Sequence, residues 1–265
     1  MISLVALEHE FGAIRVCRDK ATGELTFLQG GCFQTKTDVN GVSLVTYVHA
    51  LFGLVMQAQA QTVLVIGCGG GSLASMLAKA GKRVVVVDVN PAAIEIAQRH
   101  FNLPESVDCH VADGAEFLRE DHRDFDAIIM DAYCGDRIPD HMRSVEFFRS
   151  SKLRLARPHG CFLANIHVID DADPAAHDYA QAVGEIWARV RILDAPRGMY
   201  RNAIVAAGAV GKLRPPALMV SPAREADAIA QELARARFNE ILEHSARYPA
   251  SKSTKADDDV GEREA

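Results

Sequence analysis

The chain has 265 residues, of which 49% are hydrophobic, and a formal net charge of −6. This length suits one large α/β domain or a medium domain with a small appendage, and the apolar content is enough for a sizeable core. The acidic balance, with no block of basic residues, argues against a surface that binds nucleic acid.

Residues 1–58 are expected to form a small N-terminal β region followed by a lead-in helix. The segments SLVAL, GAIRVCRD and GELTFLQ are short, apolar and separated by glycines, which is typical of a β-meander that ends near residue 37. In residues 46–58 the apolar positions recur at helical spacing, so this segment is predicted to be a helix that leads into the core.

Residues 59–212 alternate between strand-like and helix-like segments. Strands are expected at 62–66, 84–88, 107–111, 126–131, 160–166, 189–194 and 203–207, and helices at about 71–81, 91–101, 113–119, 143–155 and 174–187. This alternation predicts an α/β fold with a mostly parallel, doubly wound sheet covered by helices on both faces. The turn APRGMYRN before the last strand is too short for a crossover helix, so that strand should be antiparallel.

Residues 213–248 are expected to carry a long C-terminal helix. Ser221-Pro222 would cap it, it would end near Tyr248, and its apolar stripe would consist of Ile229, Leu233, Phe238, Ile241 and Leu242. We expect the stripe to pack against the protein's own core, with a homodimer contact as the alternative. Residues 249–265 are expected to be disordered.

Cysteine usage and hydropathy give expectations about the compartment. The six cysteines are scattered without a CxxC pair, and no Cys/His cluster has ligand spacing, so we expect free thiols and no metal. The longest apolar stretch, residues 44–56, is too short to span a bilayer and contains Tyr47 and His49. With no signal-peptide pattern at the start, these features predict a soluble cytoplasmic protein without a membrane partner.

The segment VLVIGCGGGS, residues 63–72, runs from an apolar strand directly into a glycine cluster. About twenty residues after Gly67, Asp88 ends the next apolar run, which is the arrangement of a nucleotide-binding βαβ unit. Gly67, Gly69 and Gly71 would let the turn approach a ligand, and Asp88 would accept hydrogen bonds from both ribose hydroxyls. The motif predicts an adenosine-containing cofactor. Ser72 stands where the dinucleotide fingerprint has its last glycine, so an NAD-dependent enzyme ranks last.

Two further strands end in acids. The third ends in Asp113-Gly114, where the carboxylate can accept the exocyclic amine of adenine and the glycine allows close approach; a plain helix N-cap is a compatible reading of Asp113. The fourth ends in Asp131, at the edge where α/β sheets hold ligands. With the antiparallel end of the sheet, these acids favour a Rossmann-like class I methyltransferase fold over a dehydrogenase.

The segments VLVIGCGGGSLASML, VVVVDVNPAAIEIAQRHF, ADGAEFL and DFDAIIMDAY resemble, in order and spacing, the spermidine synthase (polyamine aminopropyltransferase) family, and the likeness extends over about residues 10–210. The resemblance implies S-adenosylmethionine or its decarboxylated form as co-substrate and a small-molecule amine as acceptor. It implies that Asp131 is the catalytic aspartate and that Tyr47 orients the amine or relays its proton. The implied donor contacts are Gln34 to the adenosine or sulfur end, Asp88 to ribose, Asp113 and Gly114 to adenine, and Pro139 over the base.

The chain also departs from the family pattern. The glycine-loop position that holds an aspartate in the family is Gly70, the second acid after the catalytic one is Cys134, and Tyr47 is followed by Val48 and His49 instead of His and Glu. Asp136 and Asp140 are candidates to replace the missing amine-binding acids. Attack on the propyl carbon would be aminopropyl transfer, which is the predicted function. The alternatives are a methyltransferase acting on a small amine or other nucleophile, and a non-catalytic nucleoside-binding protein.

Overall fold

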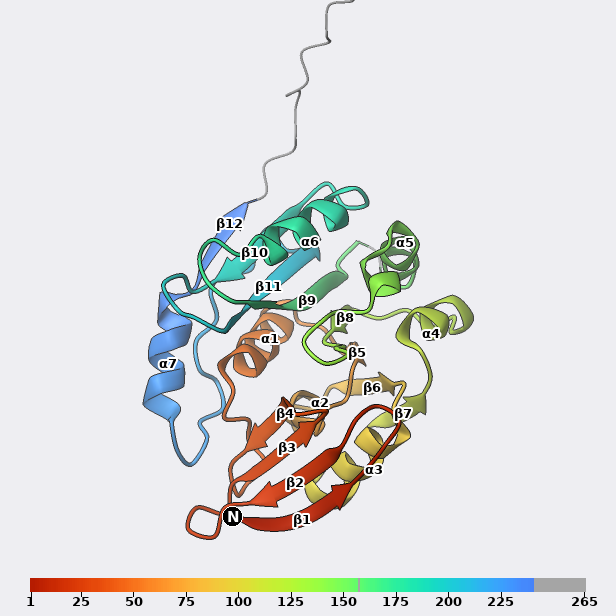
Figure 1. Ribbon diagram of the computed structural model, residues 1–265. Coiled ribbons are helices and arrows are strands. Elements are labelled where there is room, and N and C mark those ends of the chain that lie inside the picture. The colour runs from red at the N-terminus through yellow and green to blue at the C-terminus, as the bar shows by residue number, and fades with distance from the viewer. Residues whose placement is uncertain (157, 241–265) are drawn as a thin grey trace, which may run out of the picture.

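Figure 1 shows the computed structural model, in which residues 1–156 and 158–240 are described. Its N-terminal part is a four-stranded antiparallel sheet in the order β1 (Ile2–Leu7), β2 (Ile14–Arg18), β3 (Leu25–Gln29) and β4 (Cys32–Thr37). The expected meander is present, and β4 is a strand that the sequence patterns did not separate from its neighbours. β3 and β4 are joined by Gly30-Gly31, both at positive φ, which suits a two-residue hairpin turn.

The second sheet has eight strands in the order β12-β10-β11-β9-β8-β5-β6-β7. Its parallel part consists of β5 (Thr62–Ile66), β6 (Arg83–Asp88), β7 (Asp108–Val111), β8 (Ala127–Met130) and β9 (Cys161–Val168). β11 (Arg201–Gly208) lies between β9 and β10 (Val190–Asp194) and is antiparallel to both. The predicted doubly wound sheet with an antiparallel strand near its end is therefore confirmed.

Helices cover both faces of this sheet because successive residues of its strands point to opposite sides. Val63 and Val65 of β5 belong to one buried cluster, whereas Leu64 and Ile66 belong to the other. The first face is covered by α1 (Thr46–Gln57), α2 (Ser72–Lys79) and α3 (Pro91–His100). The second is covered by α4 (Gly114–Glu120), α5 (Val145–Leu153) and α6 (Ala175–Gly184), with a short 3-10 helix, η1 (Asp140–Arg143), before α5.

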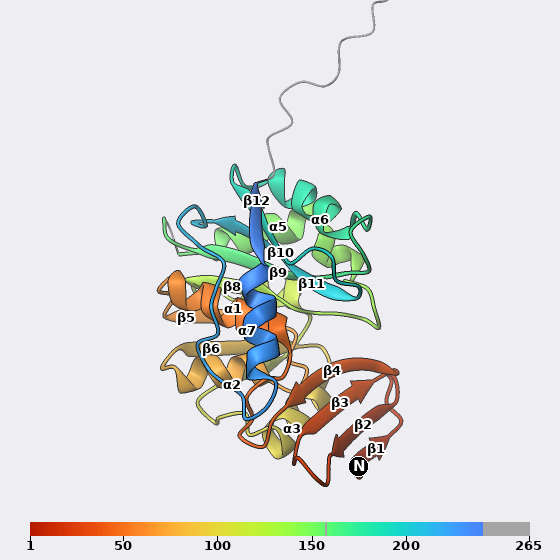
Figure 2. The same cartoon turned by 90° about the vertical axis from the view of Figure 1, so that its left-hand side faces the viewer.

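The expected long C-terminal helix is wrong in its extent. The helix α7 spans Ala226–Arg235, so Ser221-Pro222 does not cap it, and the chain then forms β12 (Arg237–Glu240) along the edge of the sheet (Figure 2). The backbone of β10 offers unpaired groups at that edge, and the ring of Phe238 lies 3.8 Å from the guanidinium carbon of Arg191. Pairing with β10 and this stacking contact outweigh continuation of the helix.

Two residues of the predicted stripe, Ile229 and Leu233, are buried against the core as expected. Ile241, Leu242, Tyr248 and the tail 249–265 lie outside the described residues. Within residues 1–156 and 158–240, no helix has both the length and the apolar character needed to cross a membrane. The same ranges contain no group of three or more His, Cys, Asp or Glu side chains arranged to hold a metal ion.

Candidate active site

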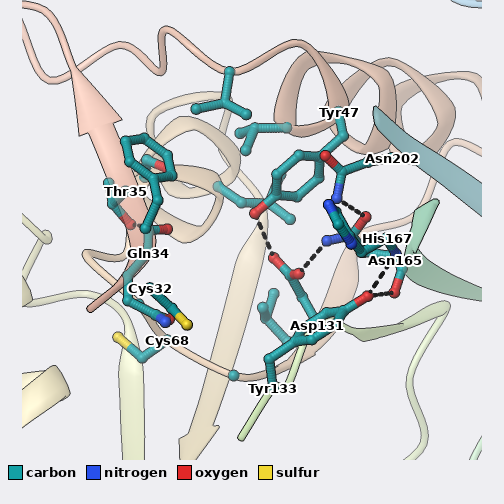
Figure 3. A pocket seen from close by; sticks show the side chains of 18 of the residues that line it. Cys32, Gln34, Thr35, Tyr47, Cys68, Asp131, Tyr133, Asn165, His167 and Asn202 are labelled. Carbon is teal, nitrogen blue, oxygen red and sulfur yellow. Dashed lines mark hydrogen bonds between the residues drawn. The ribbon is translucent and has the colours of Figure 1, made fainter. Parts of the chain in front are cut away.

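A cavity of about 460 Å³ opens at the carboxyl ends of β5, β8 and β9 (Figure 3). Strand β4 and the loop after β5 form one side, and the first turn of α1 with residues from β9 and β11 forms the other. The predicted site residues that line it are Gln34, Tyr47, Gly67, Gly69, Asp131 and Asp136. This edge of the sheet is where α/β folds place their ligands.

Asp131 directly follows β8, and its carboxyl group lines the cavity. Its Oδ1 accepts a hydrogen bond of 2.7 Å from Asn165 Nδ2, and its Oδ2 accepts one of 3.3 Å from the Tyr47 hydroxyl. Burial raises the pKa of this carboxyl from 3.8 to about 7, although both hydrogen bonds oppose the shift. A carboxyl with this pKa exists in both protonation states near neutral pH, so it can accept a proton from a bound substrate.

A chain of polar groups that the sequence patterns did not single out supports Asp131. Asn202 of β11 donates to Asn165 Oδ1 at 3.0 Å, so the amide of Asn165 is oriented with its nitrogen toward Asp131. The Tyr133 hydroxyl donates to the carbonyl oxygen of Asn165 at 2.8 Å and accepts from the backbone nitrogen of His167 at 2.9 Å. The sequence did contain a signal for this network, because an asparagine inside the apolar strand 160–166 requires buried hydrogen-bond partners.

The glycine loop approaches both the catalytic segment and the N-terminal sheet. Gly67 has φ +99°, and a Cβ there would lie 2.3 Å from the carbonyl oxygen of Asp131. At Gly70 a Cβ would lie 2.9 Å from Thr35 Cγ2, while the Gly70 nitrogen donates to Thr35 Oγ1 at 2.8 Å. Strand β4 therefore fills the space that a side chain at position 70 would need. This explains in physical terms why no acid stands there.

Asp88 lies at the end of β6 beside the glycine loop. Its Oδ2 accepts from the backbone nitrogen of Cys68 at 2.7 Å and its Oδ1 from that of Asn90 at 2.8 Å. Burial is the largest influence on its pKa and raises it, while the two backbone hydrogen bonds lower it. Each carboxylate oxygen retains a lone pair, so the group can still accept two hydroxyl hydrogen bonds.

Gly71, Asp88, Asp113, Gly114 and Pro139 are not among the residues that line the 460 Å³ cavity. Asp113 is the N-cap of α4: its Oδ1 accepts from the nitrogens of Ala115 and Glu116, and its Oδ2 lies 2.7 Å from His141 Nε2. A Cβ on Gly114 would lie 2.3 Å from Ile66 Cγ2, so this glycine lets α4 pack against β5. Pro139 is the residue before η1. The predicted adenine contacts of Asp113, Gly114 and Pro139 stay predictions.

Of the two candidate replacement acids, Asp136 lines the cavity, whereas Asp140 is exposed at the start of η1 and does not. His49 is buried with its Nε2 2.7 Å from the carbonyl oxygen of Ser43, which places it in the core. Cys134 is exposed and does not line the cavity.

Residues 63–150 match the model of a methyltransferase domain. Among curated proteins, the polyamine aminopropyltransferase of Chromobacterium violaceum is 34% identical over 128 residues, which cover 46% of this chain and 49% of that protein. The chain spans about half the length of the curated relatives that it matches.

Two solved structures share nearly the whole architecture. A probable spermidine synthase from Corynebacterium glutamicum is 21% identical with a TM-score of 0.71, covering 89% of this chain and 90% of that one. Spermidine synthase from Thermotoga maritima is 18% identical with a TM-score of 0.63, covering 88% of each chain. The chain thus has a spermidine synthase-like, class I S-adenosylmethionine-dependent fold with a small N-terminal antiparallel sheet, as the sequence resemblance predicts.

Proposed function

We propose that this chain is a transferase that moves an aminopropyl group from decarboxylated S-adenosylmethionine to a small amine acceptor. The observation that carries the proposal is the buried carboxyl of Asp131, which faces the cavity between Asn165 and Tyr47 and has a pKa of about 7. Similarity to polyamine aminopropyltransferases over about half of the chain supports the same reaction.

The donor fits the glycine-loop side of the cavity. Gly67, Gly69, Gln34 and Cys68 line the cavity on this side. A volume of about 460 Å³ is within the usual range for sites of small molecules and cofactors. In this proposal Asp88 holds the ribose hydroxyls. Asp113, Gly114 and Pro139 hold the adenine after local rearrangement, because His141 and Met142 now contact the first two.

The donor, when bound, supplies a sulfonium that makes its attached carbons electrophilic. An acceptor amine has an ordinary pKa of ~10.4 and arrives mostly protonated, so the site has to remove a proton before the nitrogen can attack. Asp131 accepts that proton, and its hydrogen bonds with Asn165 and Tyr47 hold both oxygens in place. The nitrogen bonds to the propyl carbon, the carbon–sulfur bond breaks, and its electron pair stays on sulfur, which gives 5′-methylthioadenosine.

The test is to incubate the purified protein with decarboxylated S-adenosylmethionine and a panel of amines and to measure release of 5′-methylthioadenosine. The expected result is acceptor-dependent release that is lost in Asp131→Asn. A parallel reaction with S-adenosylmethionine measures methyl transfer. If methylated product and S-adenosylhomocysteine form instead, the chain is a methyltransferase and the proposal is wrong.

One observation keeps methyl transfer as the second candidate. The glycine loop has no acid at position 70, and Thr35 fills the space where one would stand. The loop therefore supplies no carboxylate for the free amine of an aminopropyl arm, and selection between the two donors has to come from elsewhere in the cavity. Binding of none of the sulfonium donors would instead favour the non-catalytic alternative.

The proposal includes a cytoplasmic location, because all six cysteines are free thiols, as expected in a reducing compartment. The predicted homodimer and the predicted division at residues 58, 212 and 248 stay predictions.

A further inference from the structure

A small pocket of about 140 Å³ lies next to the 460 Å³ cavity, which we call the main cavity, and the mechanism above does not use it. It is bordered by the segment that follows Asp131, by η1, by the end of β9 and by α6. Tyr133, Asp136 and His167 line both spaces. Sites for cofactors and drug-sized molecules usually have about 300–1,000 Å³, so this pocket suits only a small ligand.

The side chains that line this small pocket carry more positive than negative charge. Arg137 comes from the loop after β8, Arg143 from the end of η1 and His167 from β9, so three separate parts of the chain each contribute a basic side chain. Asp136 is the one acid among the residues that line the pocket. Even with His167 neutral, the two guanidinium groups outweigh this single carboxylate.

The basic side chains of the pocket have no partner in the part of the chain that the structure describes. Arg123 and Arg201, elsewhere in the molecule, each form ion pairs with two aspartates. Within residues 1–156 and 158–240, Arg137 and Arg143 form neither an ion pair nor a side-chain hydrogen bond. The imidazole of His167 makes no hydrogen bond in these ranges either, and its ring stacks on Tyr200 with the centroids 6.3 Å apart.

The two tyrosine hydroxyls at the pocket already have partners. The Tyr133 hydroxyl donates to one backbone carbonyl of β9 and accepts from one backbone nitrogen of that strand, and the Tyr179 hydroxyl donates to the carbonyl oxygen of Met142 at 3.2 Å. Burial raises the pKa of Tyr179 well above its usual value, and the charge of Arg143 opposes that shift, so the guanidinium is close enough to act on this buried hydroxyl. The donors left for a ligand are the two guanidinium groups and the imidazole of His167.

We propose that this pocket binds a small oxyanion, a carboxylate or a phosphate, through Arg137 and Arg143, with His167 as a third donor. Planar guanidinium groups donate paired hydrogen bonds to the oxygens of such anions. The bound anion would connect the loop after β8 and η1 to β9, beside the tyrosine that supports Asn165 (Figure 3). The inference concerns binding alone and does not depend on the proposed reaction.

The test is a calorimetric titration of inorganic phosphate and, separately, of acetate into the purified chain, with the ionic strength held constant by chloride. The wild type should bind at least one of the two anions at a single saturable site with a Kd of about 1 mM or lower, as expected for two charge-assisted hydrogen bonds. Tighter binding of phosphate than of acetate identifies a phosphate ligand. Binding of acetate that is as tight or tighter identifies a carboxylate.

Variants at the pocket locate the site. Arg137→Gln and Arg143→Gln should each weaken the binding by about tenfold or more, because each removes charge-assisted hydrogen bonds. Arg143→Lys keeps the charge without the planar fork and should lose less affinity. Arg149→Gln removes a positive charge from an exposed position of α5 outside the pocket, so it is the matched control and should bind as the wild type does.

Thermal unfolding gives a second measurement and shows that each variant is folded. The anion should raise the melting temperature of the wild type and of Arg149→Gln, but not that of Arg143→Gln. Three results would overturn the inference. These are no saturable binding of either anion at constant ionic strength, unchanged affinity in both Arg137→Gln and Arg143→Gln, and a loss in Arg149→Gln as large as theirs. In the last case binding would follow net charge and not this pocket.

Discussion

The two sides of the main cavity differ in the groups that form them. On the side formed by β4 and the glycine loop, backbone packing is tight: a Cβ would lie 2.3 Å from the Asp131 carbonyl oxygen at Gly67, and 3.0 and 2.9 Å from Thr35 atoms at Gly69 and Gly70. The side formed by β8, β9, β11 and α1 consists of polar side chains that converge on Asp131. The glycine-loop side therefore determines the shape of the cavity, and the side around Asp131 provides its reactive groups. Substitutions should therefore affect packing and donor affinity on one side, and turnover and pH dependence on the other.

The largest effect should come from Asp131→Asn. The amide keeps the size of the side chain and can still accept from Asn165, but it cannot take the amine proton. We expect turnover to fall by about 10²- to 10⁴-fold, the usual contribution of a positioned base. Donor affinity, measured by calorimetry, should change by less than about threefold. A comparable loss of donor affinity would mean that the two sides are not separate in function.

On the loop side, Gly70→Ala should reduce stability without changing the chemistry. Its Cβ would lie 2.9 Å from Thr35 Cγ2, and overpacking of this kind costs about 1–3 kcal/mol. Urea unfolding of the single variants and of the Thr35→Ala/Gly70→Ala double variant gives the coupling between the two positions. The double variant should be more stable than the sum of the single effects predicts, because truncation of Thr35 removes the close contacts with Cγ2 and Oγ1 and leaves only that with Cβ at 3.0 Å. Strict additivity would contradict close contact between β4 and the loop.

The buried carboxyl of Asp131 should also reduce the stability of the folded protein at high pH. The pKa of Asp131 is about 7 in the folded protein and near 3.8 when the chain is unfolded, so the folded state retains a proton between these values. Its contribution to stability is present below about pH 4 and is lost as the pH rises toward 7. Asp131→Asn should therefore be more stable than the wild type at pH 8, by about 4 kcal/mol, and about equal at pH 4. Equal melting temperatures at pH 8 would argue against burial of the charge.

A smaller effect, a shift in the pH dependence of kcat, should follow Asn165→Ala. The hydrogen bond from Asn165 lowers the pKa of Asp131, so its removal should raise that pKa further. The acidic limb of the kcat profile should move from near pH 7 to higher pH by about half a unit to one unit. Asn239→Ala, at an exposed position in β12, is the matched control and should leave the limb in place. A shift to lower pH would contradict the orientation assigned to the Asn165 amide.

Much of the fold could be predicted because its strands are apolar and its turns are rich in glycine. The predicted strand 62–66 coincides with β5, and the predicted helix 91–101 ends one residue beyond α3. Asp131 and Tyr47 were predicted to act together, and the structure brings them to 3.3 Å. The strand and helix predictions depend on local periodicity and on strand ends, which a single sequence displays, whereas the joint role of Asp131 and Tyr47 is implied by the family resemblance.

The failures depend on contacts between distant segments. Helical spacing continues past Arg235, but the free edge of β10 and the guanidinium of Arg191 draw Phe238 into a strand. Asn165 and Asn202 are separated by 37 positions, and only the pairing of β9 with β11 shows that they act as one unit.

The contact between Gly67 and Asp131 has a consequence for how this site can change over generations. Because a Cβ at position 67 would lie 2.3 Å from the carbonyl oxygen of Asp131, a residue larger than glycine would displace the catalytic segment. The turn that accommodates the donor and the residue that performs the reaction therefore share one backbone contact. The carbonyl oxygen at position 131 is present whichever residue stands there, so position 67 has to remain glycine for as long as the backbone keeps this course.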